Sequence, residues 1–315
     1  MTSERPVQVP RPPHPDQRRK PLPWQRPKPA EEDPDAPRAV DVIRACTNYR
    51  LAEQDVDYLA REDLRGMRLE LEYLRADTIL REHGVDHTIV VFGSTRIPEP
   101  MVARRMVEAL RAAQSVSPND KAAGRRLATA ERLLAKSHYY DVAREFGRLV
   151  GNAGGTPGKP RLAVVTGGGP GMMEAANRGA FDVGAKSVGL NIDLPHEQFP
   201  NPYITPELCF LFHYFALRKM HFMMRARALV AFPGGFGTLD ELTDALTLIQ
   251  TKKIEPMPII LFGTDYWKKL LNIDFLVEEG MIEEHDAKIV AYLDTAEEAV
   301  EFLAKHHRED VPLNT

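Results

Sequence analysis

Three glycine-rich segments have residue types and positions that suit them to hold a phosphate group. They are Gly93-Ser94-Thr95, Gly167–Gly171 and Pro233–Thr238. Glycine lets the backbone turn tightly and approach a ligand without a Cβ in the way. A helix that follows offers unpaired N–H groups and a positive dipole end. One such loop is equally well explained as a tight turn, but three at one sheet edge predict a pocket for a nucleotide or sugar phosphate.

Glu241, three residues after Thr238, is open to two interpretations. The string Thr238-Leu239-Asp240-Glu241 fits a capping box, in which Thr238 caps a helix and Glu241 reaches back to the cap. Alternatively, the carboxylate lies at the mouth of the glycine loop, where it could orient a water molecule or stabilise a cationic sugar.

Arg218 lies in the segment Leu211–Arg227, which is dense in phenylalanine, tyrosine, methionine and basic residues. This composition is typical of a buried or interface helix. A cation in such surroundings usually has a partner. A bound phosphate, a substrate base or Glu241 could supply it, and a plain structural salt bridge is equally compatible. Cys209, in the apolar run just before, is expected to pack in the core.

Two standard nucleotide-binding fingerprints are absent. The string from Ala153 to Pro160 fails the Walker A pattern at both ends. After Gly167 and Gly169, Met172 stands where the dinucleotide fingerprint requires a third glycine. Asp193 does follow about 20 residues later, at a strand end, as in dinucleotide sites. A pocket for one phosphate nevertheless fits better than a pyrophosphate cradle.

The elements that must position these loops alternate between short apolar runs and helical stretches. Such runs, rich in valine and isoleucine, indicate strands covered on both faces. With right-handed crossovers, they predict an α/β fold: a doubly wound, mainly parallel, Rossmann-like sheet with extra N-terminal helices. The predicted strands are Thr88–Phe92, Leu162–Val165, Ser187–Leu190, Ala228–Phe232, Pro258–Phe262 and Ile289–Tyr292.

The rest of the chain divides by composition. Residues 1–37 are proline-rich and predicted to be a disordered tail, residues 38–85 a helical extension, 86–307 the main domain and 308–315 a C-terminal tail. In the extension, the spacing of its apolar residues predicts a helix face that packs against the main domain. Ser115–Lys136 interrupts the main domain and is expected to extend a helix that continues through Tyr139–Val150. In the N-terminal extension, the apolar residues of the predicted helix face are Leu64, Met67, Leu71 and Leu74.

Composition limits the function classes. A hydrophobic content of 43% allows a sizeable core, and the net charge of −4 gives no overall case for nucleic acid. No apolar run is long enough to span a membrane, and the first 30 residues lack the apolar region of a secretory signal. The two cysteines fit neither a disulfide framework nor a metal site. We therefore expect a cytoplasmic protein with no membrane or nucleic-acid partner.

Two strings resemble a known family. Val165-Thr-Gly-Gly-Gly-Pro-Gly-Met-Met-Glu-Ala-Ala-Asn177 and Pro233-Gly-Gly-Phe-Gly-Thr-Leu-Asp-Glu241 are similar to motifs of the Lonely Guy (LOG) family of nucleotide phosphoribohydrolases. The second string matches that family's PGGxGTxxE pattern at every fixed position, and Arg218-Lys219 lies upstream as in the family. The resemblance covers about Asp86 to Leu303. The tail, the extension and Ser115–Lys136 lie outside the short plant pattern.

The resemblance implies hydrolysis of the N-glycosidic bond of a nucleoside 5′-monophosphate to free base and ribose 5-phosphate. It makes Arg218 and Glu241 catalytic, with no metal or cofactor, in a homodimer or larger homo-oligomer. Arg218 is a poor proton donor because its pKa exceeds about 12, so it would orient the nucleotide. The residues that the resemblance assigns to substrate binding are Gly93, Ser94, Gly168, Gly169, Met173, Glu174, Lys219, Gly234, Gly235, Phe236, Gly237 and Thr238.

Three other functions compete with hydrolysis. The same fold resembles molybdenum-cofactor carriers, so the chain could bind a nucleotide or that cofactor without turnover. A carrier, however, has no need of a carboxylate at the anomeric carbon. A dinucleotide-dependent oxidoreductase is disfavoured by the failed fingerprint. Some family members carry the label lysine decarboxylase. The sequence does not support that activity, because no pyridoxal-phosphate site can be argued from its residues.

Overall fold

The computed structural model describes residues 27–154, 162–195 and 199–306. Contacts divide the chain into two compact units, one ending at Arg68 and the other beginning at Leu69. Residues 1–26 of the predicted tail at 1–37, and the predicted C-terminal tail at 308–315, lie outside the described residues.

The first unit is a series of short helices. Its elements are α1 (Ala36–Ala45), η2 (Thr47–Tyr49), η3 (Ala52–Gln54), α2 (Val56–Leu59), η4 (Glu62–Leu64) and the start of α3 (Arg65–Glu82). Ala36 and Pro37, assigned above to the tail, form the first turn of α1, where proline is readily accommodated. None of the described residues up to Arg68 is buried.

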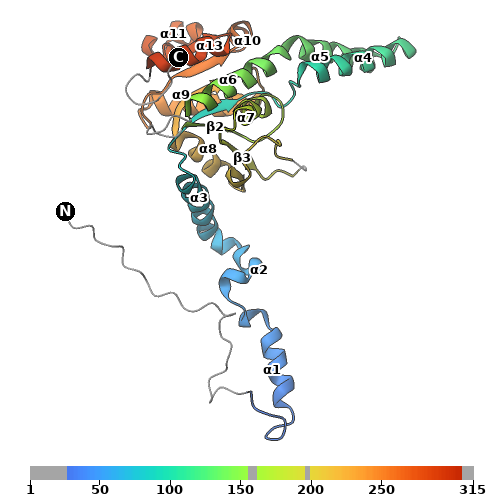
Figure 1. Ribbon diagram of the computed structural model, residues 1–315, viewed down its shortest axis with the longest axis vertical. Helices are drawn as coiled ribbons and strands as arrows, with labels where there is room; N and C mark the ends of the chain where they lie inside the picture. Colours follow the sequence, from blue (N-terminus) through green and yellow to red (C-terminus); the bar gives the residue numbers. More distant parts are fainter. Residues whose placement is uncertain (1–26, 155–161, 196–198, 307–315) are drawn as a thin grey trace, which may run out of the picture. The chain divides into compact units, whose positions relative to one another are not determined.

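The second unit is built on a parallel sheet, which confirms the predicted fold class (Figure 1). Seven strands form in the described part of the chain, in the order β4-β3-β2-β1-β5-β6-β7, and every neighbouring pair is parallel. They are β1 (His87–Phe92), β2 (Leu162–Thr166), β3 (Ser187–Ile192), β4 (Cys209–Phe212), β5 (Ala226–Ala231), β6 (Ile259–Phe262) and β7 (Val290–Leu293).

Alternating side chains of the strands feed two cores, one on each face of the sheet. On β1, Ile89 and Val91 pack with α6 (His138–Gly154), α7 (Met172–Asp182) and α13 (Ala296–His306). Val90 and Phe92 face the opposite core. That core includes buried residues of α3, α8 (Phe215–Met224), α9 (Phe236–Gln250) and α10 (Thr264–Leu270). The remaining helices of the described part are α4 (Pro100–Val116), α5 (Lys121–Lys136), η5 (Pro206–Leu208), α11 (Ile273–Glu278) and α12 (Glu284–Ala287).

The predicted packing face of α3 is wrong. Met67, Leu71 and Leu74 are 54%, 55% and 44% exposed. The helix instead buries Ala76, Asp77 and Leu80. Asp77 is held by an ion pair with Arg225, 2.5 Å between Oδ1 and Nη2. This polar anchor orients the helix, and the apolar spacing alone could not reveal it.

Ser115–Lys136 contains the end of α4, the turn that follows and all of α5, so α4 and α5 together make a helical hairpin. Helices α4 and α5 pack along each other, and in Figure 1 they project from the sheet. Helix α5 ends at Lys136, and α6 starts afresh at His138 after Ser137, whose hydroxyl donates to Leu134 O at 2.8 Å. The predicted continuous helix is therefore wrong.

No helix among the described residues is long and apolar enough to cross a membrane.

Candidate active site

The strand order has a switch point, where the direction in which successive strands are added to the sheet reverses. The strands from β1 to β4 progress to one side, and β5 lies on the other side of β1. In doubly wound sheets ligands bind beyond the carboxyl ends of the strands at such a switch point. The loops after β1 and β5 meet there, because Ser94 donates its N–H to Pro233 O at 3.0 Å. A Cβ on Gly93 would lie 2.6 Å from the Met172 Cβ, so only glycine permits this approach.

The loop after β2 joins the first loop at this edge. Met172 donates its N–H to Ser94 O at 3.2 Å. Gly171 has φ of +73°, and a Cβ there would meet Ser94 O at 2.4 Å. All three predicted glycine loops thus converge on one side of the sheet, as the sequence analysis expected.

A buried polar network fixes the shape of the second loop. Thr166 Oγ1 donates to Asn177 Oδ1 at 2.7 Å and accepts from Gly168 N at 2.9 Å. Asn201 donates its backbone N–H to Gly168 O at 2.8 Å and its side-chain amide to Gly169 O at 3.2 Å. Sequence reasoning missed Asn201, which lies 32 residues from the loop that it supports.

Helix α9 presents an open N-terminus at the third loop. It begins at Phe236, with Gly235 as the N-cap and no side-chain cap. Gly235 and Gly237 are exposed, and a Cβ on either would meet nothing within 4 Å. The first N–H groups of α9 are therefore placed for an anion. This start also shows that the capping-box interpretation of Thr238 and Glu241 is wrong, because Thr238 lies inside the first turn.

Helix α10 holds this third loop from the other side. Tyr266 donates its hydroxyl to Gly234 O at 2.5 Å. The fully buried Trp267 donates its indole N–H to Ala231 O at 3.2 Å, at the end of β5. Sequence reasoning missed both residues, and no local motif marks them.

Arg218 and Glu241 form a buried ion pair beside the glycine loops. Nη2 of Arg218 lies 3.0 Å from Oε1 of Glu241, and each residue is 8% exposed. The Phe215 and Phe222 rings flank the guanidinium, at 5.2 and 5.6 Å from Cζ. A Cβ on Gly167 would lie 3.8 Å from Nη1, so the arginine adjoins the second loop. The anion partner that the sequence left open is therefore Glu241.

Burial sets the protonation of this pair. It raises the pKa of Glu241 to about 7, although the Arg218 cation acts in the opposite direction. Burial likewise lowers the pKa of Arg218, against the attraction of Glu241. A carboxyl that titrates near neutral pH is suited to general acid–base work.

The other predicted site residues differ in their surroundings. Lys219 pairs with Asp240 at 2.7 Å, next to the buried pair but on the exposed side. Met173 adjoins Gly167, since a Cβ built on Gly167 would lie 3.0 Å from the Met173 sulfur. Glu174 accepts a hydrogen bond from the buried Tyr140 hydroxyl at 2.7 Å. Phe236 is 92% exposed at the start of α9.

Cys209 is not a core residue. It is half-buried on β4, at the edge of the sheet, and accepts a hydrogen bond from Asn191 Nδ2 at 3.3 Å. Within the ranges that the structure describes, no three histidine, cysteine, aspartate or glutamate side chains are grouped to hold a metal ion.

Glu72 of α3 holds the start of α8, and sequence reasoning missed it. Its carboxylate accepts hydrogen bonds from the backbone N–H groups of His213 and Tyr214, immediately before α8. An anion at a helix N-terminus satisfies free donors and favours the helix dipole. Glu72 thereby fixes the helix that carries Arg218.

The parallel sheet with its glycine loops at the switch point makes this a Rossmann-like α/β protein. The family model "Possible lysine decarboxylase" matches residues 173–303. The cytokinin riboside 5′-monophosphate phosphoribohydrolase LOG3 of Arabidopsis thaliana is 30% identical over 177 residues, which cover 54% of this chain and 77% of that protein. LOG of Oryza sativa subsp. japonica is 31% identical over 170 residues, covering 52% and 66%. The chain belongs to the LOG family.

Solved structures with a similar fold include molybdenum cofactor proteins. The carrier protein of Chlamydomonas reinhardtii is 18% identical with a TM-score of 0.40, over 70% of this chain and 99% of that one. The binding protein of Rippkaea orientalis is 17% identical with a TM-score of 0.43, over 70% and 97%.

Proposed function

We propose that this protein hydrolyses the N-glycosidic bond of a nucleoside 5′-monophosphate to a free base and ribose 5-phosphate. The observation that carries the proposal is the buried Arg218–Glu241 pair beside three glycine loops. The activity in the names of LOG3 and LOG supports the reaction class. A cytokinin riboside 5′-monophosphate and AMP are the first substrates to consider.

The 5′-phosphate binds at the N-terminus of α9 in this proposal. The N-terminus of α9 has no side-chain cap, and a Cβ on Gly235 or Gly237 would meet nothing within 4 Å, so the first N–H groups are open to a ligand. The helix dipole attracts the anion. This contact lies away from the reacting bond. Its binding energy therefore positions the anomeric carbon for reaction.

Glu241 acts at the anomeric carbon. As the bond to the base breaks, the sugar gains oxocarbenium character, which a nearby carboxylate stabilises. A water oxygen bonds to C1′ while the base leaves with the electron pair of the broken bond. Glu241 accepts the proton from water and returns it to the departing base. Arg218 stays cationic, holds the carboxylate in place and orients the nucleotide.

The test is a panel of nucleoside 5′-monophosphates, including AMP and a cytokinin riboside 5′-monophosphate, with adenosine as the control that lacks phosphate. Chromatography should show base and ribose 5-phosphate in equal amounts, and adenosine should react much more slowly than AMP. Equal rates for adenosine and AMP would contradict the phosphate-binding role of α9. Tight nucleotide binding without turnover would favour a carrier.

We also propose that the protein works in the cytoplasm as a homodimer or larger homo-oligomer. Large apolar side chains near the site are exposed, including Phe215 at 48%, Met220 at 40% and Met224 at 42%. Exposed apolar clusters of this kind mark interfaces. Sedimentation equilibrium at micromolar concentration should give at least twice the chain mass of 35.4 kDa.

A further inference from the structure

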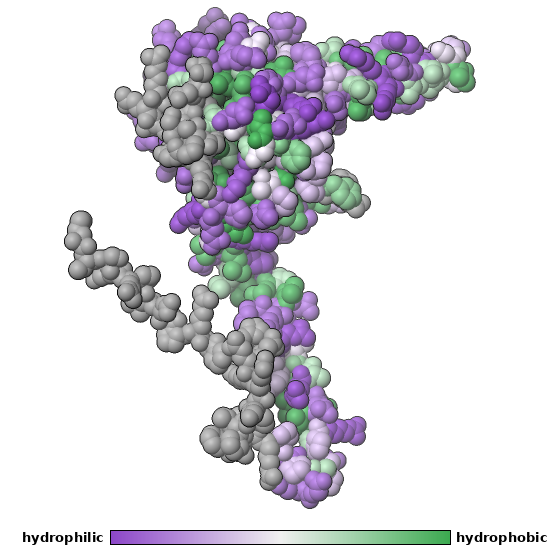
Figure 2. Space-filling view, in the orientation of Figure 1, coloured by the Kyte–Doolittle hydropathy of each residue, from purple (hydrophilic) through white to green (hydrophobic). Residues whose placement is uncertain are grey.

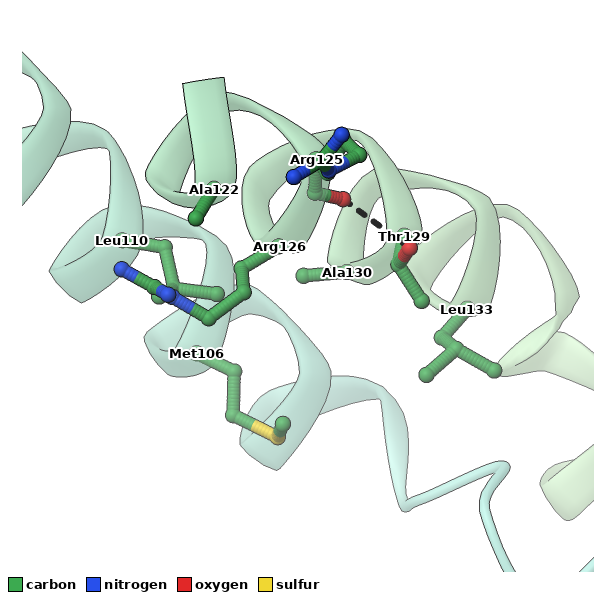
Figure 3. Close-up of a pocket in the computed structure, with 8 residues that line it drawn as sticks. All are labelled: Met106, Leu110, Ala122, Arg125, Arg126, Thr129, Ala130 and Leu133. Atoms are coloured by element: carbon green, nitrogen blue, oxygen red, sulfur yellow. Dashed lines mark hydrogen bonds between the residues drawn. The ribbon is translucent and has the colours of Figure 1, made fainter. Parts of the chain in front are cut away.

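The hairpin of α4 and α5 carries an open groove that the catalytic proposal does not use. The groove has a volume of about 500 Å³ (Figure 3). In the close-up, Met106 and Leu110 approach it from α4, and Leu133 approaches it from α5. The lining residues are Met106, Leu110, Ala122, Arg125, Arg126, Thr129, Ala130 and Leu133.

The hairpin buries its small apolar residues and leaves larger ones in water. Alanines and a valine fill the contact between the helices, while Met101 is 59% and Met106 43% exposed. Two helices alone cannot cover the seam on both sides, whereas a third helix packed along it would. The buried small residues are Ala103, Val107, Ala123 and Ala130.

The hairpin is strongly basic although the whole chain has a net charge of −4. Between residues 100 and 136 there are eight arginines and lysines against three acidic residues, a net charge of +5. Two of those three acids are engaged: Asp120 caps α5 and lies 3.6 Å from Arg126, and Glu131 pairs with Arg111 at 2.8 Å. Figure 2 shows hydrophilic and hydrophobic residues side by side along the hairpin.

Arg125 places its charge at the groove without a carboxylate partner. Within the part of the chain that the structure describes, it forms no ion pair, and it is exposed on the lining of the groove. Arg126, its neighbour on the lining, lies 3.6 Å from Asp120. The groove thus combines an apolar floor with a cationic rim.

We propose that the groove between α4 and α5 docks an acidic amphipathic helix of a partner protein. The partner's apolar residues, at helical spacings of three and four, lie against Met106, Leu110 and Leu133. Its aspartates and glutamates face Arg125 and Arg126. Docking completes a three-helix bundle and follows the helix-in-groove mode of recognition.

Charge and composition select this occupant over two others. A second copy of the hairpin would bring another net charge of +5 and be repelled. Single-stranded nucleic acid needs aromatic side chains for its bases to stack on, and none of the eight lining residues is aromatic. Methionine and leucine on the floor match an apolar helix face better than a phosphate backbone.

The test uses the full chain and three labelled 20-residue peptides, followed by fluorescence anisotropy. The first peptide has leucines at helical spacing and glutamates elsewhere, the second has the same composition in scrambled order, and the third replaces glutamate by lysine. A 20-nucleotide single-stranded RNA is the fourth probe. The acidic amphipathic peptide should bind at least about tenfold more tightly than the other three, and salt should weaken its binding.

Two hairpin variants locate the binding. The double variant R125E with R126E should weaken binding of the amphipathic peptide at least about tenfold, because it reverses the charge at the groove. Met106→Glu, at an exposed position, should do the same without disturbing the buried contacts of the hairpin. K252E with K253E, at exposed lysines outside the hairpin, is the matched charge control and should bind as wild type does.

Three results would overturn the proposal. The scrambled peptide could bind as tightly as the amphipathic one, which would indicate charge attraction without docking. The hairpin variants could bind as wild type does, which would place the contact elsewhere. RNA could bind more tightly than the peptide and depend on Arg125 and Arg126, which would assign the groove to nucleic acid. Because no readout depends on turnover, these results are independent of the catalytic proposal.

Discussion

Glu241 and Arg218 face each other inside the protein, where water screens little of their charge. Burial of Glu241 keeps its proton bound up to about pH 7, because burial raises the pKa of this carboxyl. Below that pH the carboxyl is neutral and can neither stabilise an oxocarbenium ion nor accept a proton from water. Above it the carboxylate is ionised and paired with Arg218.

The pH dependence of turnover follows from this shift. The value of kcat/KM for AMP should rise as pH increases through about 7 and then level off, because the ionised form is the active one. A spectrophotometric or chromatographic assay from pH 5 to 9 measures this profile. An ordinary glutamate would give a midpoint near 4.5 instead. A midpoint there would show that Glu241 is not the titrating group.

Substitutions at Gly237 and Gly234 test phosphate binding and stability separately. Gly237→Ala should fold as wild type does, since a Cβ there meets nothing within 4 Å, but it should raise KM for AMP about tenfold or more by filling ligand space. Gly234→Ala should instead lower the melting temperature, because its Cβ would lie 2.1 Å from Thr238 Oγ1. Thermal unfolding and steady-state kinetics on both variants test the pair. An unchanged KM in Gly237→Ala would place the phosphate elsewhere.

At the scale of elements, α3 positions α8 through polar contacts. Glu72 accepts hydrogen bonds from the backbone N–H groups just before α8, and Asp77 forms an ion pair with Arg225 just after that helix. These contacts join an N-terminal helix to the helix that carries Arg218. Their role is to position Arg218, since neither acid touches the proposed substrate site.

Glu72→Gln should lower kcat by about tenfold and change KM less. The reason is that Arg218 is held less firmly while the phosphate site is unaltered. Amide hydrogen exchange at His213 and Tyr214 should speed up in the same variant. Glu70→Gln, an exposed neighbour on α3, is the matched control. Unchanged exchange in Glu72→Gln would remove Glu72 from this role.

The elements differ in how far the sequence could predict them. Buried strands such as β1 and β5 were predicted because valine and isoleucine runs between glycines indicate covered parallel strands. Strand β4 was missed, because Cys209–Phe212 runs directly into the aromatic segment that becomes α8. The start of α9 was misplaced because Thr238 and Glu241 match a cap that Gly235 provides instead. The pairing of Arg218 with Glu241 was one of several open options, and only the fold decides it.

At the scale of the whole molecule, the two units differ in what they contribute to stability. No described residue up to Arg68 is buried, and Val42, Ile43 and Val56 are 67%, 56% and 74% exposed. Burial of apolar surface is the main source of folding stability, so the first unit adds little to the second.

Removal of residues 1–60 should therefore leave the melting temperature of the main transition within a few degrees of the full chain. The truncated chain keeps all of α3, including Glu72 and Asp77, and should retain AMP turnover. Differential scanning calorimetry with a parallel activity assay measures both. A large drop in melting temperature or a loss of AMP turnover would contradict this prediction.

The central claim is that Glu241 drives hydrolysis of a nucleoside 5′-monophosphate. The most direct measurement incubates AMP with wild type and with Glu241→Gln, both checked for folding and nucleotide binding, and quantifies adenine and ribose 5-phosphate. We predict equal amounts of both products from wild type, and a rate at least about a hundredfold lower from Glu241→Gln although it still binds AMP. Comparable turnover by the variant, or no product from folded wild type with any nucleotide of the panel, would contradict the account.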